Sequence, residues 1–152
     1  MEHIQVPVEA RMVKSRGNDD GLKTVLLADD DEDFRCLLAE LLTAEGFRVI
    51  DVPSGEQALA FLDRATKASG RSPDLLVLDL MMPKVSGIEV LQKLRKSVRW
   101  TRLPILVVTG VNDPMLRVRL DLPIAFKPDA EVIVEAVHRL LRAWPTAAEH
   151  AR

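Results

Sequence analysis

Short apolar runs alternate along the chain with longer stretches in which apolar residues recur every three or four positions. The short runs lie between turn residues or charges and are too short for helices, so they predict strands. The five predicted strands span residues 24–28, 47–52, 75–78, 105–108 and 124–126. The first, third and fourth runs are continuously apolar, which is typical of strands buried on both faces of a parallel sheet.

Amphipathic helices are predicted between the strands and after the last one. Apolar residues from Phe34 to Leu42 repeat at the spacing of one helix face, and Asp31 is expected to cap that helix. Ser54 and Gln57 form a capping-box pattern at the start of a second helix. The other helices are expected over 86–97, over a short segment capped by Asp113 and ending before Pro123, and over 131–144. Trp100 is expected in a loop beside the third helix.

The alternation of strand and helix predicts an α/β fold. In such a fold a doubly wound parallel sheet has right-handed crossovers that bury both of its faces. Residues 1–23 show no sustained periodicity and contain the turn-rich stretch SRGNDDG, so they are expected to form a flexible tail. The folded domain is therefore expected over residues 24–144, followed by a frayed tail at 145–152.

Composition narrows the class of protein. The 152 residues are 47% hydrophobic and 29% charged, which favours a folded domain over a disordered chain. The net charge of −2 excludes a whole-molecule field that attracts nucleic acid or anionic lipid. The single cysteine, Cys36, fits a reducing compartment, and no apolar run approaches the ~18 residues of a membrane span. A cytoplasmic protein that binds neither nucleic acid nor membrane directly is expected.

Candidate chemistry lies directly after the predicted strands, where α/β sheets bind their ligands. Asp29 and Asp30 follow the first strand, Asp79 the third, Thr109 the fourth and Lys127 the fifth. Clustered carboxylates repel one another unless a cation is bound, and oxygen ligands favour Mg²⁺. An aspartate can act as a nucleophile and form an acyl phosphate, while a metal ion, a lysine and a hydroxyl stabilise the transferred group.

At these residues the sequence resembles the receiver domain of bacterial two-component response regulators. The resemblance covers roughly residues 24–144 through the segments VLLADDDEDF, DLLVLDLMMPKVSG, ILVVTG and AFKP. It implies a flavodoxin-like sheet of five strands in the order 2-1-3-4-5, with Asp79 as phosphoacceptor. It also implies that Asp29, Asp30, Asp79 and the backbone carbonyl of Met81 hold Mg²⁺, with Asp30 as a direct ligand. The phosphoryl donor would be a phosphohistidine on a sensor histidine kinase or a histidine phosphotransfer protein.

The resemblance assigns Lys127 to the phosphoryl group, with a cis peptide before Pro128. The segment between Thr109 and Lys127 is shorter than the family pattern, so a shortened fourth helix region is expected. Ile124 stands where the family usually has an aromatic residue, which puts the usual relay of phosphorylation in doubt. Met81 and Val111 occupy two variable positions that tune phosphate hydrolysis in the family. Because both are apolar and neither can orient a water molecule, a long-lived phosphate is predicted.

The expected function is that of a single-domain response regulator, a phosphoacceptor switch rather than an enzyme with a separate substrate. It is expected to be a monomer or weak dimer that acts through a downstream protein. One alternative is a phosphorylation-independent docking module, which the altered segment before Ile124 favours and the intact Asp79, Thr109 and Lys127 oppose. Another is a phosphatase of the haloacid dehalogenase kind, but that family needs an acid where this chain has Met81.

Overall fold

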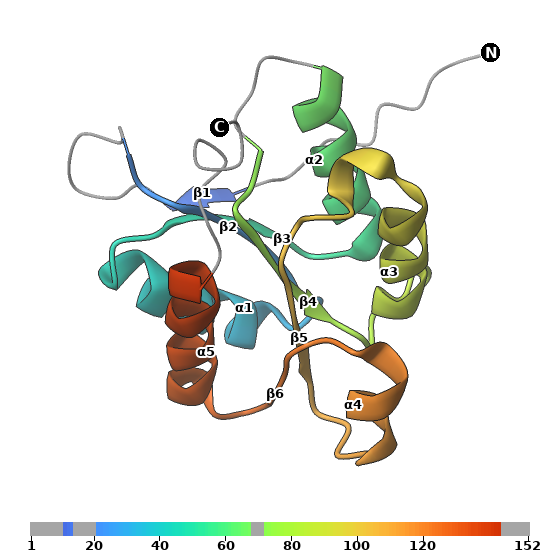
Figure 1. The fold of residues 1–152 in the computed structure, drawn as a ribbon. Helices are drawn as coiled ribbons and strands as arrows, with labels where there is room; N and C mark the ends of the chain where they lie inside the picture. Colours follow the sequence, from blue (N-terminus) through green and yellow to red (C-terminus); the bar gives the residue numbers. More distant parts are fainter. Residues whose placement is uncertain (1–10, 14–20, 68–71, 144–152) are drawn as a thin grey trace.

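The computed structural model describes residues 11–13, 21–67 and 72–143 (Figure 1). The tail expected at 145–152 and most of the tail expected at 1–23 lie outside the described residues. The elements follow one another as β1 (Arg11–Val13), β2 (Thr24–Ala28), α1 (Glu32–Ala44), β3 (Arg48–Val52), α2 (Gly55–Lys67), β4 (Leu75–Asp79), α3 (Gly87–Lys96), a 3₁₀ turn (Val98–Trp100), β5 (Ile105–Thr109), α4 (Met115–Leu120), β6 (Ile124–Phe126) and α5 (Ala130–Ala143).

The sheet has the strand order β1-β3-β2-β4-β5-β6. The five strands from β2 to β6 are parallel, and their order is the 2-1-3-4-5 arrangement expected for the five predicted strands. The α/β fold with a flavodoxin-like parallel sheet is thus confirmed. The fourth helix is short, as expected, and spans only Met115–Leu120.

The strand β1 differs from the expectation that residues 1–23 form a tail. Its three residues pair antiparallel with β3, and Met12 lies opposite Ile50. A strand this short shows no periodicity that could distinguish it from a linker. The backbone groups on the outer edge of β3 provide the reason for the pairing, because an unpaired sheet edge offers hydrogen bonds to any extended segment nearby.

Successive residues of the central strands point into two separate cores, as the pleat of a strand requires. Leu26, Leu76 and Val107 lie in one core with α2, α3 and α4. The intervening residues, such as Leu27 and Val77, lie in the other core with α1 and α5. Figure 1 shows these two helix layers on opposite sides of the sheet. Burial on both faces explains why the central strands are continuously apolar.

Side chains at the helix starts confirm most of the predicted caps. Asp31 accepts a hydrogen bond from the Phe34 amide at 3.1 Å, and Ser54 accepts one from the Gln57 amide at 3.2 Å. At α4 the cap position is Pro114 rather than Asp113, although Asp113 Oδ1 still accepts from the Met115 amide at 2.9 Å. None of the helices in the described ranges combines the length and apolar content of a membrane span.

Candidate functional site

The carboxyl ends of four parallel strands bring the predicted site residues to one edge of the sheet. Asp79 is the last residue of β4 and Thr109 the last of β5, while Asp29 and Lys127 directly follow β2 and β6. The side chains of Asp29, Asp79 and Thr109 are buried, although all three are polar. Buried polar groups cost free energy unless they are paired, so their common location marks a site built for chemistry.

Three carboxylates form an acidic cluster at this edge: Asp29, Asp30 and Asp79. One oxygen of each lies within 4.8 Å of one oxygen of each of the others. Asp29 and Asp79 are buried and Asp30 is exposed, so the cluster opens to solvent on one side. Hard oxygen donors at this spacing fit Mg²⁺, which keeps several waters and takes only one or two carboxylates directly. The residues present therefore fit the ion that the sequence predicts.

The ammonium group of Lys127 lies between two of these carboxylates. Its Nζ is 2.7 Å from Asp29 Oδ2 and 3.3 Å from Asp79 Oδ2. The same Nζ lies 4.9 Å from the centre of the Phe34 ring, which covers it from α1. Lys127 thus offsets part of the negative charge that burial would otherwise make costly.

Backbone amides fix the other oxygens of the two buried carboxylates. The Asp31 amide donates to Asp29 Oδ1 at 2.9 Å, and the Met81 amide donates to Asp79 Oδ1 at 3.1 Å. Each carboxylate is therefore held by an amide on one oxygen and by Lys127 on the other. The role expected for the Met81 carbonyl as a metal ligand stays a prediction.

Burial and charge shift the proton affinities at the site. Burial and the nearby Asp29 charge raise the pKa of Asp79 from 3.8 to about 6, against the opposing effects of the Met81 amide and Lys127. Burial lowers the pKa of Lys127. The hydrogen bond and charge of Asp29, and then the charge and hydrogen bond of Asp79, have the opposite effect and are together larger, so the pKa of Lys127 is raised. Lys127 therefore stays charged at neutral pH, and a cation near Asp79 would favour its ionised form.

Thr109 and the peptide before Pro128 lie at the same edge of the sheet as the acidic cluster. The Thr109 hydroxyl is fully buried and its Oγ1 accepts from the Val111 amide at 3.1 Å. Its carbonyl accepts from the Lys127 amide at 3.0 Å, which ties the end of β5 to the end of β6. The Lys127–Pro128 peptide bond is cis.

The residues that depart from the family pattern have two different environments. Met81 and Val111 are 66% and 43% exposed and flank the site as apolar side chains. Ile124 is half-buried and packs against the core beneath α2 and α3. The aromatic ring of this strand is Phe126 instead, and the Arg117 guanidinium of α4 lies 5.6 Å from its centre.

Two residues that the sequence pattern did not indicate lie behind the site: Arg35, which contacts Asp29, and Asp51, which contacts Arg35. Arg35 Nε donates to Asp51 Oδ2 at 3.0 Å, and Arg35 Nη1 donates to the Asp29 carbonyl at 2.8 Å. An aspartate among the apolar residues that follow Arg48 in the strand RVIDV was the available signal for Asp51. Nothing in the helical pattern distinguishes Arg35 from a solvent-exposed residue.

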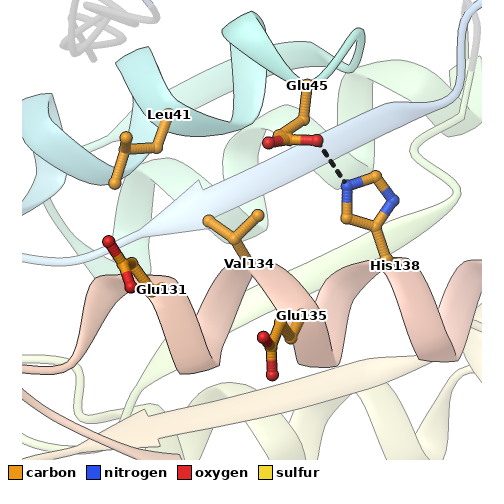
Figure 2. A pocket seen from close by; sticks show the side chains of 6 residues that line it. All are labelled: Leu41, Glu45, Glu131, Val134, Glu135 and His138. Atoms are coloured by element: carbon orange, nitrogen blue, oxygen red, sulfur yellow. Dashed lines mark hydrogen bonds and ion pairs between the residues drawn. The ribbon is translucent and has the colours of Figure 1, made fainter.

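A hollow lies between α1 and α5, apart from the acidic cluster (Figure 2). It encloses about 400 Å³ and is lined by Leu41, Glu45, Glu131, Val134, Glu135 and His138. His138 Nε2 lies 3.0 Å from Glu45 Oε2, and Figure 2 shows this pair at one end of the hollow. Among the described residues, only the acidic cluster at the sheet edge brings three metal-ligand groups together.

Comparisons with known proteins agree with the geometry. The family model of the response regulator receiver domain matches residues 25–122. The transcriptional regulatory protein CpxR of Escherichia coli strain K12 is 42% identical over 97 residues, or 64% of this chain and 38% of that protein. This chain therefore spans about two fifths of the length of that relative.

Two solved structures are also similar. The chemotaxis protein CheY4 of Vibrio cholerae is 25% identical with a TM-score of 0.68, over 78% of this chain and 98% of that one. The response regulator TrrA of Thermotoga maritima, solved in complex with Mg²⁺ and BeF, is 28% identical with a TM-score of 0.62. That match covers 78% of this chain and 99% of the other.

Proposed function

Because the chain belongs to the response regulator receiver-domain family, whose members accept phosphoryl groups in two-component signalling, we propose that Asp79 accepts a phosphoryl group from a phosphohistidine. An oxygen of Asp79 forms the new bond to phosphorus while the phosphorus–nitrogen bond of the donor breaks. The electron pair of that bond stays on the imidazole, which takes up a proton. The donor would be a sensor histidine kinase or a histidine phosphotransfer protein.

The position of Lys127 is the observation that supports this proposal most strongly. Its ammonium lies between Asp79, the proposed nucleophile, and Asp29, a proposed metal ligand, where it can neutralise a transferred phosphoryl group. The buried Thr109 hydroxyl would bind another phosphoryl oxygen after releasing the Val111 amide. Asp29, Asp30, Asp79 and the Met81 carbonyl would hold Mg²⁺, which supplies positive charge to the phosphoryl oxygens when bound.

We propose a phosphoacceptor switch that alters binding to a downstream protein, rather than an enzyme that turns over a separate substrate. The exposed Met81 argues against a haloacid dehalogenase-like phosphatase, because a thioether cannot serve as the acid that such an enzyme needs at that place. Single-domain status, the oligomeric state and the cytoplasmic location stay predictions.

Intact-mass spectrometry with acetyl phosphate as donor tests the proposal. We expect the wild-type protein with Mg²⁺ to gain one phosphate adduct and the Asp79→Asn variant to gain none, because the amide is not a nucleophile. Chelation of the metal with EDTA should abolish the adduct on the wild type. An adduct that persists on Asp79→Asn would place the phosphate elsewhere. Absence of an adduct on folded wild-type protein, also with a phosphohistidine donor, would favour a phosphorylation-independent docking module.

We predict a long-lived phosphate because Met81 and Val111 give water no polar partner beside Asp79. Introducing a polar side chain by Met81→Asn or Val111→Glu should shorten the half-life by about tenfold or more, since such a group can orient the attacking water. The measurement is the decay of the phosphate adduct after removal of the donor. Val118→Glu is the matched control, because Val118 is an exposed apolar residue of α4. Rapid decay in the wild type that neither site variant changes would contradict the prediction.

A further inference from the structure

A buried ion pair lies directly behind the acidic cluster. Arg35, in the first turns of α1, and Asp51, in β3, are joined by the 3.0 Å contact between Nε and Oδ2. Their side chains are only 11% and 3% exposed. Neither residue belongs to the set that contacts a phosphoryl group or a metal in the proposed function.

The same guanidinium also holds the backbone at the end of β2. Arg35 Nη1 donates to the carbonyl oxygen of Asp29 at 2.8 Å. The Asp29 amide donates to the carbonyl oxygen of Val52, in the neighbouring strand β3, at 3.2 Å. Asp29 is therefore fixed on both sides of its α-carbon, by β3 at the amide and by Arg35 at the carbonyl.

A buried ion pair contributes little net free energy to folding, because removing both charges from water costs free energy. Among the described residues, Asp51 Oδ1 is buried without a hydrogen-bond partner, so the carboxylate keeps part of its desolvation penalty. Replacing such a pair with apolar residues of similar volume is often neutral or stabilising. A role in geometry rather than in stability accounts better for a charged pair at this place.

The charges of the pair also suit its position beside a cation site. A guanidinium that contacts the Asp29 backbone would oppose the binding of a cation nearby if its charge were not neutralised. Asp51 neutralises Arg35 from the side of β3, since its Oδ2 contacts Arg35 Nε. The pair can thus orient the Asp29 backbone without removing negative potential from the acidic cluster.

We propose that Arg35 and Asp51 are positioning residues for the metal-binding loop of residues 29–31. They hold the Asp29 backbone so that the carboxylates of Asp29 and Asp30 face Asp79 before Mg²⁺ binds. The Asp31 amide, which donates to Asp29 Oδ1, depends on the same loop geometry. This inference rests on the proposed function in taking Mg²⁺ as the ion of the acidic cluster.

Calorimetric titration with MgCl₂ alone measures the effect on metal binding. Arg35→Ala and Asp51→Asn should each raise the Kd for Mg²⁺ by about 10- to 100-fold, the usual effect of losing a residue that orients metal ligands. Arg35→Lys should bind with intermediate affinity, because an ammonium can contact Asp51 or the Asp29 carbonyl but does not have the guanidinium fork. Arg99→Ala is the matched control, since Arg99 donates to the Ala65 carbonyl at 2.9 Å far from the strand ends.

The double variant Arg35→Met with Asp51→Leu separates positioning from stability. It removes both charges at once, so it should fold at least as stably as either single variant while its Mg²⁺ affinity remains low. In metal-free protein, the amide NMR signal of Asp31 should shift in the double variant and stay unchanged in Arg99→Ala. Wild-type Mg²⁺ affinity together with an unshifted Asp31 amide in the double variant would overturn the inference.

The two proposals fail in different ways. If wild-type protein binds no Mg²⁺ and accepts no phosphate, the proposed function is wrong, and the Asp31 signal still reports whether Arg35 and Asp51 set the loop geometry. If wild-type protein binds Mg²⁺ and accepts phosphate while the double variant does both equally well, only the positioning role is wrong.

Discussion

Replacing Asp79 with asparagine will stabilise the metal-free protein at neutral pH by about 3 kcal/mol. The folded protein raises the pKa of Asp79 from 3.8 to about 6, so the native state binds this proton more tightly than the unfolded chain does. Stability therefore falls as the pH rises from about 4 through 6 and stays lower above that range, at about 1.4 kcal/mol for each unit of pKa shift. Asparagine removes the charge and keeps an oxygen that can accept from the Met81 amide.

Urea denaturation of both proteins at several pH values, in EDTA, measures this difference. The difference in the free energy of unfolding between Asp79→Asn and the wild type should shrink towards zero near pH 4, where the Asp79 carboxyl of the folded wild type is protonated. It should also shrink when Mg²⁺ is added, because a ligand of the folded state stabilises the wild type by about 2.7 kcal/mol at 100 times its Kd. Asp121→Asn is the control, since Asp121 is exposed and asparagine tolerates its left-handed backbone. A destabilised Asp79→Asn protein at neutral pH would contradict the prediction.

The Gly87→Ala substitution will destabilise the protein by about 3 kcal/mol or more and will impair phosphate uptake. A β-carbon at Gly87 would lie 2.2 Å from the Asp79 carbonyl oxygen and 2.7 Å from the Leu80 α-carbon. Both neighbours are backbone atoms of the segment that carries Asp79, so no side-chain rotation relieves the overlap. The Gly87 amide also donates to the Leu80 carbonyl at 3.0 Å, which holds α3 against this segment. Overpacking costs of this kind usually reach 1–3 kcal/mol and exceed that where backbone must move.

Gly110→Ala provides the comparison, because a β-carbon there meets no atom of the described residues within 4 Å apart from its chain neighbours. Urea denaturation should therefore show a small change for Gly110→Ala and a large one for Gly87→Ala. The rate of adduct formation with acetyl phosphate should fall in Gly87→Ala even at temperatures where the variant is folded. A Gly87→Ala protein within about 1 kcal/mol of the wild type would show that the backbone near Asp79 can move aside at little cost.

The central strands and the acidic cluster could be predicted because their physical causes are local in sequence. A strand buried on both faces has an uninterrupted run of apolar residues in its sequence. The residue after that run lies at the carboxyl edge of a parallel sheet. Asp79, Thr109 and Lys127 are each found by this rule from their own neighbours in the chain. Their convergence then follows from the strand order.

Features that depend on partners distant in sequence could not be predicted in the same way. Trp100, expected in a loop, is buried in the core with α2 and α3 because the 3₁₀ turn directs it inward. The strand β1 exists because β3 presents an unpaired edge. The contact between Arg35 and Asp51 joins a helix to a strand. The hydrophobic pattern around either residue does not indicate that the two side chains meet.

The separation of Asp29 and Lys127 along the chain has a consequence for how the protein acquires its proposed ability to accept phosphate. Asp29 follows the first parallel strand, whereas Lys127 follows the last one. Synthesis begins at the N-terminus, so β6 can join the sheet only after the residues of the central strands have been made. A chain folded only through β5 would already contain the three carboxylates and would still lack the lysine that neutralises them. We therefore expect a newly made chain to become able to accept phosphate only once its last strand has docked, so that competence for signalling reports complete folding.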